Sequence, residues 1–415
     1  PDGGPRRRDA RGRHRGSTPP LISRSSRQNG GMLERATRSV YLIFGLTGVF
    51  AATMVARVPQ IRDTLHLKPG PLGVLLLMVA VGSVISLPLA GTIVHRLGPA
   101  RAVRIMCLLA ATGVAIAGLG LQVSVYMSGA GFLFAGFGVG TWDVSMNVEG
   151  AAVEQQLGRS VMARFHAAFS LGTVLGALIG AAMNALDVGP TPHIVAVSVV
   201  VGISVFLLAG GFMPVHDDAN APKHNPFEAW KEPRTLLIGL FVLTMAFSEG
   251  TGNDWLGVAT IDGYHGSKAM GSLVYVLFVA SMTTGRWFGP PLLDRFGRVP
   301  VMRVSAALAA VGAGIVVFGP AIGTVFLGTL LWGVGTSLGF PTGMSAASDD
   351  PAKAAGRVSV VATIGYVAFL AGPSAIGWIG NHTGVRKALM VTCVMALIAL
   401  ANAGSTRPLT SGDPS

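Results

Sequence analysis

Long apolar runs occupy almost the whole chain, and they decide the fold class. A helix needs about 20 residues to cross the hydrocarbon region of a bilayer. Twelve runs reach this length, at approximately 37–58, 72–94, 102–121, 124–149, 162–186, 192–213, 235–256, 270–292, 300–319, 321–343, 358–380 and 386–404. Backbone polar groups find no water in lipid, so such runs must be helical. We therefore predict an all-α membrane protein whose twelve transmembrane helices lie in a lipid bilayer.

Two short segments recur at about half the length of the chain. Residues 89–99 read LAGTIVHRLGP, and their counterpart PLLDRFGR at 291–298 lies about 199 positions later. The tetrapeptide at 138–141, GVGT, returns at 333–336 with an offset of 195. Membrane chains with repeated halves are typically transporters that bind their substrate between two bundles. We predict two pseudo-symmetric six-helix bundles, 36–213 and 235–405, joined by a cytoplasmic linker at 214–234.

The two ends of the chain differ from this apolar body. Arginines before Met32 stand among Gly, Pro and Ser, a composition that cannot bury a core. We predict that residues 1–35 are a disordered, Arg-rich cytoplasmic tail, or that the segment before a natural start at Met32 is not native. No interleaved aromatic residues accompany these arginines, so we expect no nucleic-acid binding. Residues 406–415 are expected to form a second cytoplasmic tail.

The placement of lysine and arginine sets the orientation. With the N-terminus inside, the tails and inner loops carry 24 of these residues and the outer loops carry 6. An excess of positive charge marks the cytoplasmic side of a membrane protein. We therefore expect a multi-pass protein of a bacterial inner (plasma) membrane, with both termini in the cytoplasm.

The repeated loop resembles the signature loop of the major facilitator superfamily. The resemblance covers the whole twelve-span body and implies the fold given above, a monomer and a latch on the cytoplasmic side. The implied latch residues are Gly91, His95, Arg96 and Gly98 in the first half, and Asp294, Arg295, Gly297 and Arg298 in the second. The chain departs from the family pattern at His95, where Asp is usual, and at Pro290, where Gly is usual. Because imidazole titrates near neutral pH, we expect the first latch to be weaker or pH-sensitive.

Further segments resemble the poorly characterised YbjJ-like branch, which is related to sugar-permease-type facilitators. These segments are ARVP at 56–59, WDVSMNVEG at 142–150 and RFHAAFSLG at 164–172. Residues 248–250 and 253–255 support the same resemblance. It implies no particular substrate.

Polar and ionisable residues inside the apolar runs are the candidates for a transport site, because they are costly in lipid. Asp143 and Asn147 share a helix face, and His166 lies at a similar depth in the next span. Glu249 lies deep in the seventh span, with Asn253 one turn further on. The predicted substrate and proton cavity consists of Asp143, Asn147, His166, Glu249, Asn253 and Trp142. The alternative is that these groups form hydrogen bonds that only hold helices together.

Other charged residues near the ends of spans suggest different roles. Arg57 and Asp254 occupy nearly equivalent outer ends of the first and seventh spans, so we predict that they pair as an outer gate when that side closes. Arg286 is expected to extend to the membrane interface or to pair with Asp294. Contact between Arg286 and an anionic substrate is the alternative.

The remaining sequence patterns bear on the class of function. Metal-ligand spacings, phosphate-binding loops and nucleophile–base arrangements do not occur, so we expect no enzyme, no catalytic residue, no metal and no cofactor. We predict a secondary active transporter of a small polar solute, driven by the proton gradient through alternating access. An alternative is a proton-driven exporter of amphiphilic drugs or secondary metabolites, although the cavity spans hold few aromatic residues. A third possibility is a membrane sensor that does not transport, but no soluble terminal domain accompanies the spans.

Overall fold

The computed structural model describes residue 4 and residues 24–67, 69–214 and 225–409. The predictions for residues 1–23, for most of the linker and for residues 410–415 lie outside the described residues, apart from Gly4. Throughout the described part of the chain the regular structure is helical, and it contains no strand. This agrees with the all-α prediction.

The first half contains one short and six long α-helices within the described residues. They are α1 (Arg24–Ala56), α2 (Val58–Thr64), α3 (Pro69–Leu97), α4 (Pro99–Gly120), α5 (Val125–Leu157), α6 (Met162–Ala185) and α7 (Pro190–Leu208), followed by the 3-10 turn η1 (Ala209–Gly211). Helix α1 differs from our prediction, because it begins within the predicted disordered tail. The first span continues as a helix toward the N-terminus, and the i,i+4 ion pair of Glu34 with Arg38 supports one of these turns.

The second half begins after the linker. Its elements are η2 (Pro226–Lys231), α8 (Pro233–Tyr264), α9 (Lys268–Phe288), α10 (Pro290–Phe296), α11 (Arg298–Phe318), α12 (Ile322–Thr336), α13 (Gly339–Ala347), α14 (Ala354–Thr383), α15 (Val385–Ala388), α16 (Met390–Asn402) and η3 (Ala403–Thr406). The tenth apolar run is thus divided between α12 and α13, and the twelfth between α15 and α16.

Each of the twelve predicted runs coincides with a helix or with two consecutive helices. By length and apolar composition alone, ten helices of the described residues are able to cross a membrane. Helices α5 and α9 are not among these ten. The reason is their content: α5 is rich in glycine, and α9 contains Arg286. Both features have a structural use, because α5 packs closely on its neighbours and Arg286 forms part of the site.

Glycines allow the long helices of the first half to approach each other closely. A Cβ atom on Gly136 of α5 would lie 1.9 Å from the backbone oxygen of Val79 in α3. A Cβ atom on Gly172 of α6 would likewise lie 1.9 Å from the backbone oxygen of Gly45 in α1. Small residues at helix crossings let backbones pack together in membranes. These two crossings join α3 to α5 and α1 to α6.

The internal repeat is visible in the backbone. Gly98, between α3 and α4, has φ 73° and ψ 158°. Gly297, between α10 and α11, has φ 80° and ψ 161° and lies 199 positions later. A positive φ of this size strains any residue with a Cβ atom, so the turn requires glycine in both halves. The repeated motif therefore builds the same helix–glycine–helix turn twice.

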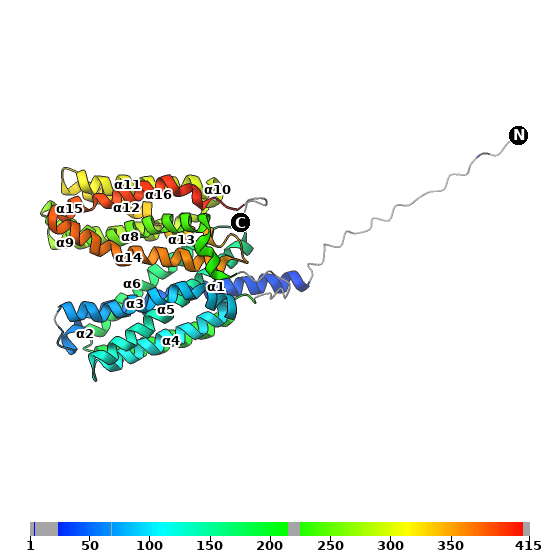
Figure 1. The fold of residues 1–415 in the computed structure, drawn as a ribbon, viewed down its shortest axis with the longest axis horizontal. Coiled ribbons are helices and arrows are strands. Elements are labelled where there is room, and N and C mark those ends of the chain that lie inside the picture. Colours follow the sequence, from blue (N-terminus) through cyan, green and yellow to red (C-terminus); the bar gives the residue numbers. More distant parts are fainter. Residues whose placement is uncertain (1–3, 5–23, 68, 215–224, 410–415) are drawn as a thin grey trace.

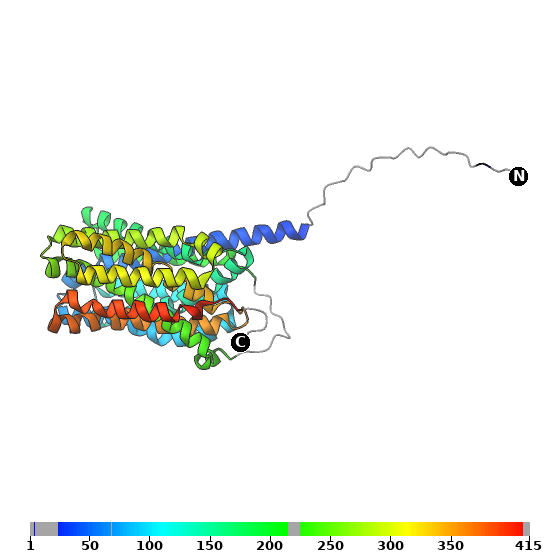
Figure 2. The same ribbon diagram turned by 90° about the horizontal axis from the view of Figure 1, so that it is seen from above.

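The two halves form two bundles that lie against each other at one end (Figure 1). The bundles meet near the C-terminus, where α10 and α13 lie, and they diverge toward the end that carries α2 and α15. The first turns of α1 project beyond the bundle at the end where the halves meet (Figure 2). We call this end, defined by α10, α13 and the start of α8, the closed end.

Candidate functional site

Hydrogen bonds join the two halves at the closed end and at the centre of the bundle. At the closed end, Gln155 Nε2 donates to the Ser348 carbonyl at 2.5 Å and the Ser160 N–H donates to Asp294 Oδ1 at 2.8 Å. Arg164 donates to the Trp287 carbonyl, and the Ser345 hydroxyl donates to Glu154. Nearer the centre, the Ser359 hydroxyl donates to the Leu87 carbonyl, and Arg286 donates to Ser170.

Apart from the exposed pair of Glu34 with Arg38 on α1, the ion pairs that the structure describes at the closed end belong to the second half and the linker. Asp349 accepts from Arg234 at 2.7 Å and from Arg298 at 2.6 Å. Glu232 accepts from Arg357 at 2.6 Å. Within the described residues, no ion pair joins the first half to the second. The halves are therefore held together by bonds in which at most one partner carries a full charge.

The two copies of the predicted latch behave differently. In the second copy, Asp294 contacts the first half, Arg298 binds Asp349, and Arg295 lies over the ring of Phe296. In the first copy, His95 and Arg96 are exposed. Gly91 packs closely on the other half: a Cβ atom on it would lie 2.9 Å from the Ala355 carbonyl oxygen in α14. That copy contributes close backbone packing rather than a charge pair.

Arg286, in the second half, forms hydrogen bonds to residues of both halves. Its Nη2 atom is 2.8 Å from both carboxylate oxygens of Glu249 in α8. Its Nη1 atom donates to the Ser170 hydroxyl in α6 at 2.9 Å, and Nε donates to the Ser337 carbonyl at 3.2 Å. Our prediction that Arg286 extends to the interface or pairs with Asp294 is wrong, because the side chain is buried and its charge is balanced by Glu249.

A proline explains why the Ser337 carbonyl can accept a bond from Arg286. In a continuous helix that carbonyl would accept the N–H of residue 341. Residue 341 is proline and has no N–H, and the helix is interrupted between α12 and α13. The carbonyl is left without its helical partner and accepts from the guanidinium instead. The sequence thus places a helix break where the cation needs an acceptor.

Asp143 forms a second polar group at the contact of the halves. Asn147 Nδ2 lies 2.9 Å from the Asp143 backbone oxygen and 3.4 Å from its Oδ1 atom. The Tyr366 side chain of α14, in the second half, lies beside the Asp143 carboxyl. In the described part of the chain, the polar groups that bond to this carboxyl are neutral. Asp143 and Glu249 therefore differ in kind, because only Glu249 has a cation beside it.

His166 lies between rings of both halves. Its ring centroid is 5.0 Å from that of Phe44 and 5.6 Å from that of Phe340 in α13. Its Nδ1 atom is 3.1 Å from the Met162 carbonyl oxygen. Asp143 and Asn147 lie in contact, whereas the His166 ring lies beside Phe44 and Phe340. The His166 carbonyl accepts from the Ser170 hydroxyl, which in turn accepts from Arg286.

The remaining predicted site residues lie apart from these contacts. Trp142 packs on Phe50 in the core of the first half, and its place in the cavity stays a prediction. Asn253 is half-buried on α8. Arg57 is 1% exposed and donates to Asn184 and to His193 Nδ1.

Asp254, by contrast, is exposed, and it does not contact Arg57 in this structure. The proposed outer gate concerns the state in which that end closes, and here the halves meet at the opposite end. The gate therefore stays a prediction.

Sequence reasoning did not identify Ser170, Ser337 and Tyr366 as parts of the site. Tyr366 and Ser170 are neutral residues within apolar runs, and the rule that singled out ionisable residues passes over them. Ser337 acts through its backbone. The available signal was Pro341, since the carbonyl four residues before a proline in a helix always lacks its usual donor.

Comparisons with known proteins place this geometry in a family. A model of the Major Facilitator Superfamily matches residues 39–253 and 254–412. The uncharacterized transporter y4wD of Sinorhizobium fredii is 30% identical over 366 residues, which cover 87% of this chain and 95% of the relative. An uncharacterized MFS-type transporter of Yersinia pestis is 30% identical over 380 residues, covering 90% of this chain and 95% of the relative. The narrower resemblance to the YbjJ-like branch stays a prediction.

Solved structures show the same fold. FucP, a Major Facilitator Superfamily transporter solved in the outward conformation, superposes with a TM-score of 0.75 at 14% identity, over 90% of this chain and 98% of that one. A bacterial homologue of the iron transporter ferroportin, in an outward-facing state, gives a TM-score of 0.73 at 14% identity, over 89% and 99%. With its twelve apolar runs, its duplicated turn and its two bundles, the chain belongs to the Major Facilitator Superfamily and is a multi-pass membrane transporter rather than an enzyme.

Proposed function

We propose that this secondary transporter moves a small polar solute in a proton-coupled cycle, and that Asp143 carries the coupling proton. The observation that supports this is the set of partners around Asp143. Its carboxyl accepts a bond from Asn147 in its own half and lies beside Tyr366 of the other half, and both partners are neutral. Glu249 serves a different purpose, because Arg286 balances its charge.

We propose that Tyr366 donates to the ionised Asp143 carboxyl, and that this bond links proton binding to movement of the halves. A hydrogen bond to an ionised carboxylate is roughly twice as strong as one between neutral groups. Proton uptake on Asp143 therefore weakens a contact that joins α5 to α14. The halves separate more easily once the proton is bound, which is the coupling that a proton-driven cycle needs.

The polar contacts around Arg286 are suited to a solute that carries hydrogen-bond acceptors. Arg286 reaches from Glu249 to Ser170 of the opposite half, so a hydroxyl or carboxylate oxygen of a solute can take the place of the serine. Asn253 lies one turn from Glu249 on the same helix and adds an amide. We propose that the solute binds here, on the side of these residues that faces away from the closed end.

The state of the transporter follows from the proposed orientation. If both termini are cytoplasmic, as the distribution of lysine and arginine favours, the closed end is the inner end. The structure then corresponds to an outward-facing state. In this state the contacts at the closed end prevent passage to the cytoplasm.

Proton-coupled transport can be tested with purified protein in liposomes that contain a pH-sensitive dye. Sugars, nucleosides, organic acids and antibiotics are added one class at a time, and a solute-dependent proton flux is recorded. Asp143→Asn is expected to lose this flux and pH-driven accumulation while keeping solute exchange at equal concentrations on both sides. Asp63→Asn is the matched control, since Asp63 is an exposed carboxylate paired with Arg62.

Two results would contradict the proposal. Unchanged proton flux in Asp143→Asn would show that this carboxyl does not carry the proton. Flux elicited only by hydrophobic antibiotics, and unaffected by the substitution, would instead favour an exporter of amphiphilic compounds.

A further inference from the structure

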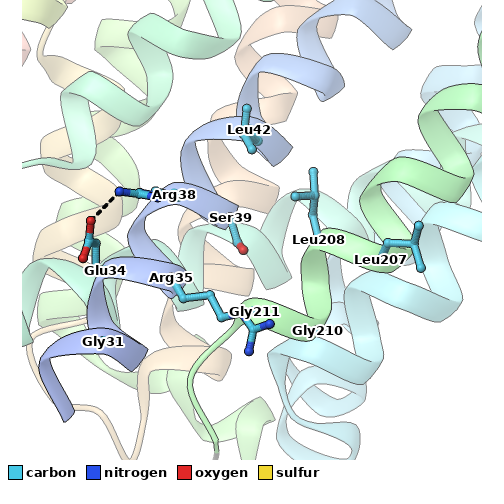
Figure 3. A pocket seen from close by; sticks show the side chains of 10 residues that line it. All are labelled: Gly31, Glu34, Arg35, Arg38, Ser39, Leu42, Leu207, Leu208, Gly210 and Gly211. Carbon is cyan, nitrogen blue, oxygen red and sulfur yellow. Dashed lines mark hydrogen bonds and ion pairs between the residues drawn. The ribbon is translucent and has the colours of Figure 1, made fainter. Parts of the chain in front are cut away.

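A hollow lies outside the region between the halves, on the first half of the molecule. It is located between the first turns of α1 and the end of α7 with the turn η1, and its volume is about 530 Å³ (Figure 3). Its lining residues are Gly31, Glu34, Arg35, Arg38, Ser39, Leu42, Leu207, Leu208, Gly210 and Gly211. We call it the arginine hollow. It lies at the closed end, beside the projecting turns of α1.

The arginine hollow carries an excess of positive charge. The Arg35 guanidinium extends toward Gly210 and Gly211 (Figure 3). Arg38 pairs with Glu34 at 2.5 Å, and their side chains are 75% and 64% exposed. Arg104 adds a third guanidinium beside Gly210, since a Cβ atom on that glycine would lie 2.5 Å from its Nη2 atom. Three cations and one carboxylate favour an anionic occupant.

Apolar side chains continue from these arginines toward the middle of the spans. Leu42 is 53% exposed one turn beyond Arg38, and Leu207 on α7 is 66% exposed. These leucines lie on helices that cross the membrane, so the side chains face lipid. The hollow thus combines a basic end with an apolar end along the direction of the spans.

This combination fits one class of molecule. We propose that the arginine hollow binds an anionic phospholipid of the adjacent leaflet, with the phosphate between Arg35 and Arg38 and an acyl chain along Leu42 and Leu207. Basic pockets between transmembrane helices are able to hold anionic lipid headgroups, and each guanidinium can donate two parallel bonds to a phosphate. The inference requires only that the chain spans a membrane, and it is independent of the transported solute.

The glycines of η1 make room for the headgroup. A Cβ atom on Gly211 would lie 2.2 Å from the Ser39 hydroxyl oxygen and 3.2 Å from Cγ of Arg35. Side chains at Gly210 and Gly211 would therefore displace the groups that form the basic end. The turn keeps its backbone close to α1 and leaves the arginines accessible from the membrane side.

The test measures thermal unfolding of the full chain in a neutral detergent with added lipid. Phosphatidylglycerol is expected to raise the unfolding temperature more than phosphatidylcholine does, and Arg35→Gln combined with Arg38→Gln should remove most of that difference. The matched control is Arg101→Gln combined with Arg303→Gln, which removes the same charge from two exposed arginines. The control should keep the full effect.

A second variant is expected to strengthen lipid binding, which a misfolded protein would not do. Glu34→Gln removes the carboxylate that competes for Arg38, so it should lower the phosphatidylglycerol concentration needed for half of the effect by about threefold, or roughly 0.6 kcal/mol. The proposal is overturned if the arginine variant and the control lose the effect equally. It is also overturned if Glu34→Gln has no influence, or if inorganic phosphate without lipid stabilises the protein as much.

Discussion

The pair formed by Glu249 and Arg286 gives a prediction whose size can be worked out from the structure. Arg286 Nη2 lies 2.8 Å from both carboxylate oxygens, and the side chains of Arg286 and Glu249 are 6% and 11% exposed. Removing one member of a buried pair costs about 3–5 kcal/mol, because the other charge remains without compensation. Arg286→Gln also loses the bond to Ser170, which is worth about 1.5–3 kcal/mol because the guanidinium is charged.

The double variant, Glu249→Gln with Arg286→Gln, carries no buried charge at this position. We therefore expect the double variant to lose less free energy of unfolding than the two single variants lose together. The difference, which is the coupling energy, should be at least about 2 kcal/mol. The assay is equilibrium unfolding in detergent micelles for the parent, both single variants and the double variant. Tryptophan fluorescence provides the signal.

The exposed pair of Glu34 and Arg38 is a matched control within the same chain. Its donor–acceptor distance is 2.5 Å, similar to that of the buried pair, but both side chains are largely in solvent. A surface i,i+4 pair contributes about 0.3–0.5 kcal/mol. If the coupling energy of the buried pair does not exceed that of the exposed pair, the argument that burial makes Arg286 and Glu249 interdependent is refuted.

Two further predictions concern packing and acid stability. Gly136→Leu should abolish folding, because its Cβ atom would already overlap the Val79 backbone, whereas Gly314→Leu, with open space around it, should give a normal gel-filtration profile. Burial tends to raise the pKa of Glu232, but the hydrogen bonds from Arg357 and Thr235 outweigh burial and lower it below the ordinary value of 4.5. Glu232 therefore stabilises the folded protein at any pH above 4.5, its ordinary pKa. This stabilisation is lost as the pH falls through the lower pKa that Glu232 has in the folded protein. Glu232→Gln should unfold at a lower temperature than the parent at pH 7.5, and the difference should shrink in acid; a constant difference would contradict this reasoning.

The fold could be predicted almost completely because bilayer thickness and backbone hydrogen bonding leave few alternatives to a long apolar run. The wrong prediction concerns a segment whose composition is compatible with either a disordered tail or a helix. Residues 24–35 have the composition of a tail, yet the adjoining span extends its helix through them. Trp142 is buried beside Phe50 in the first half, and since adjacent residues on a helix point in different directions, its place in the span does not show which residues it contacts.

The site was harder to predict because its partners come from distant parts of the chain. Glu249 and Arg286 are separated by 37 residues, and Asp143 meets Tyr366 from the opposite half. Each residue has recognisable chemistry, but the pairing depends on how helices pack across the contact between the halves. A single sequence gives the depth of a residue in its span and says little about which helix faces it.

The absence of an ion pair between the halves, within the described residues, has a consequence for the speed of the cycle. Separating two opposite full charges in a region of low dielectric is costly, whereas each bond that joins the halves is worth roughly 1 kcal/mol, or up to about 3 kcal/mol where one partner is charged. The ion pairs of Arg286, Arg298 and Arg357 remain intact when the halves part, because each lies on one side of the contact. The closed end can thus open in small steps, each comparable to a few multiples of thermal energy, and close again without rebuilding a desolvated charge pair.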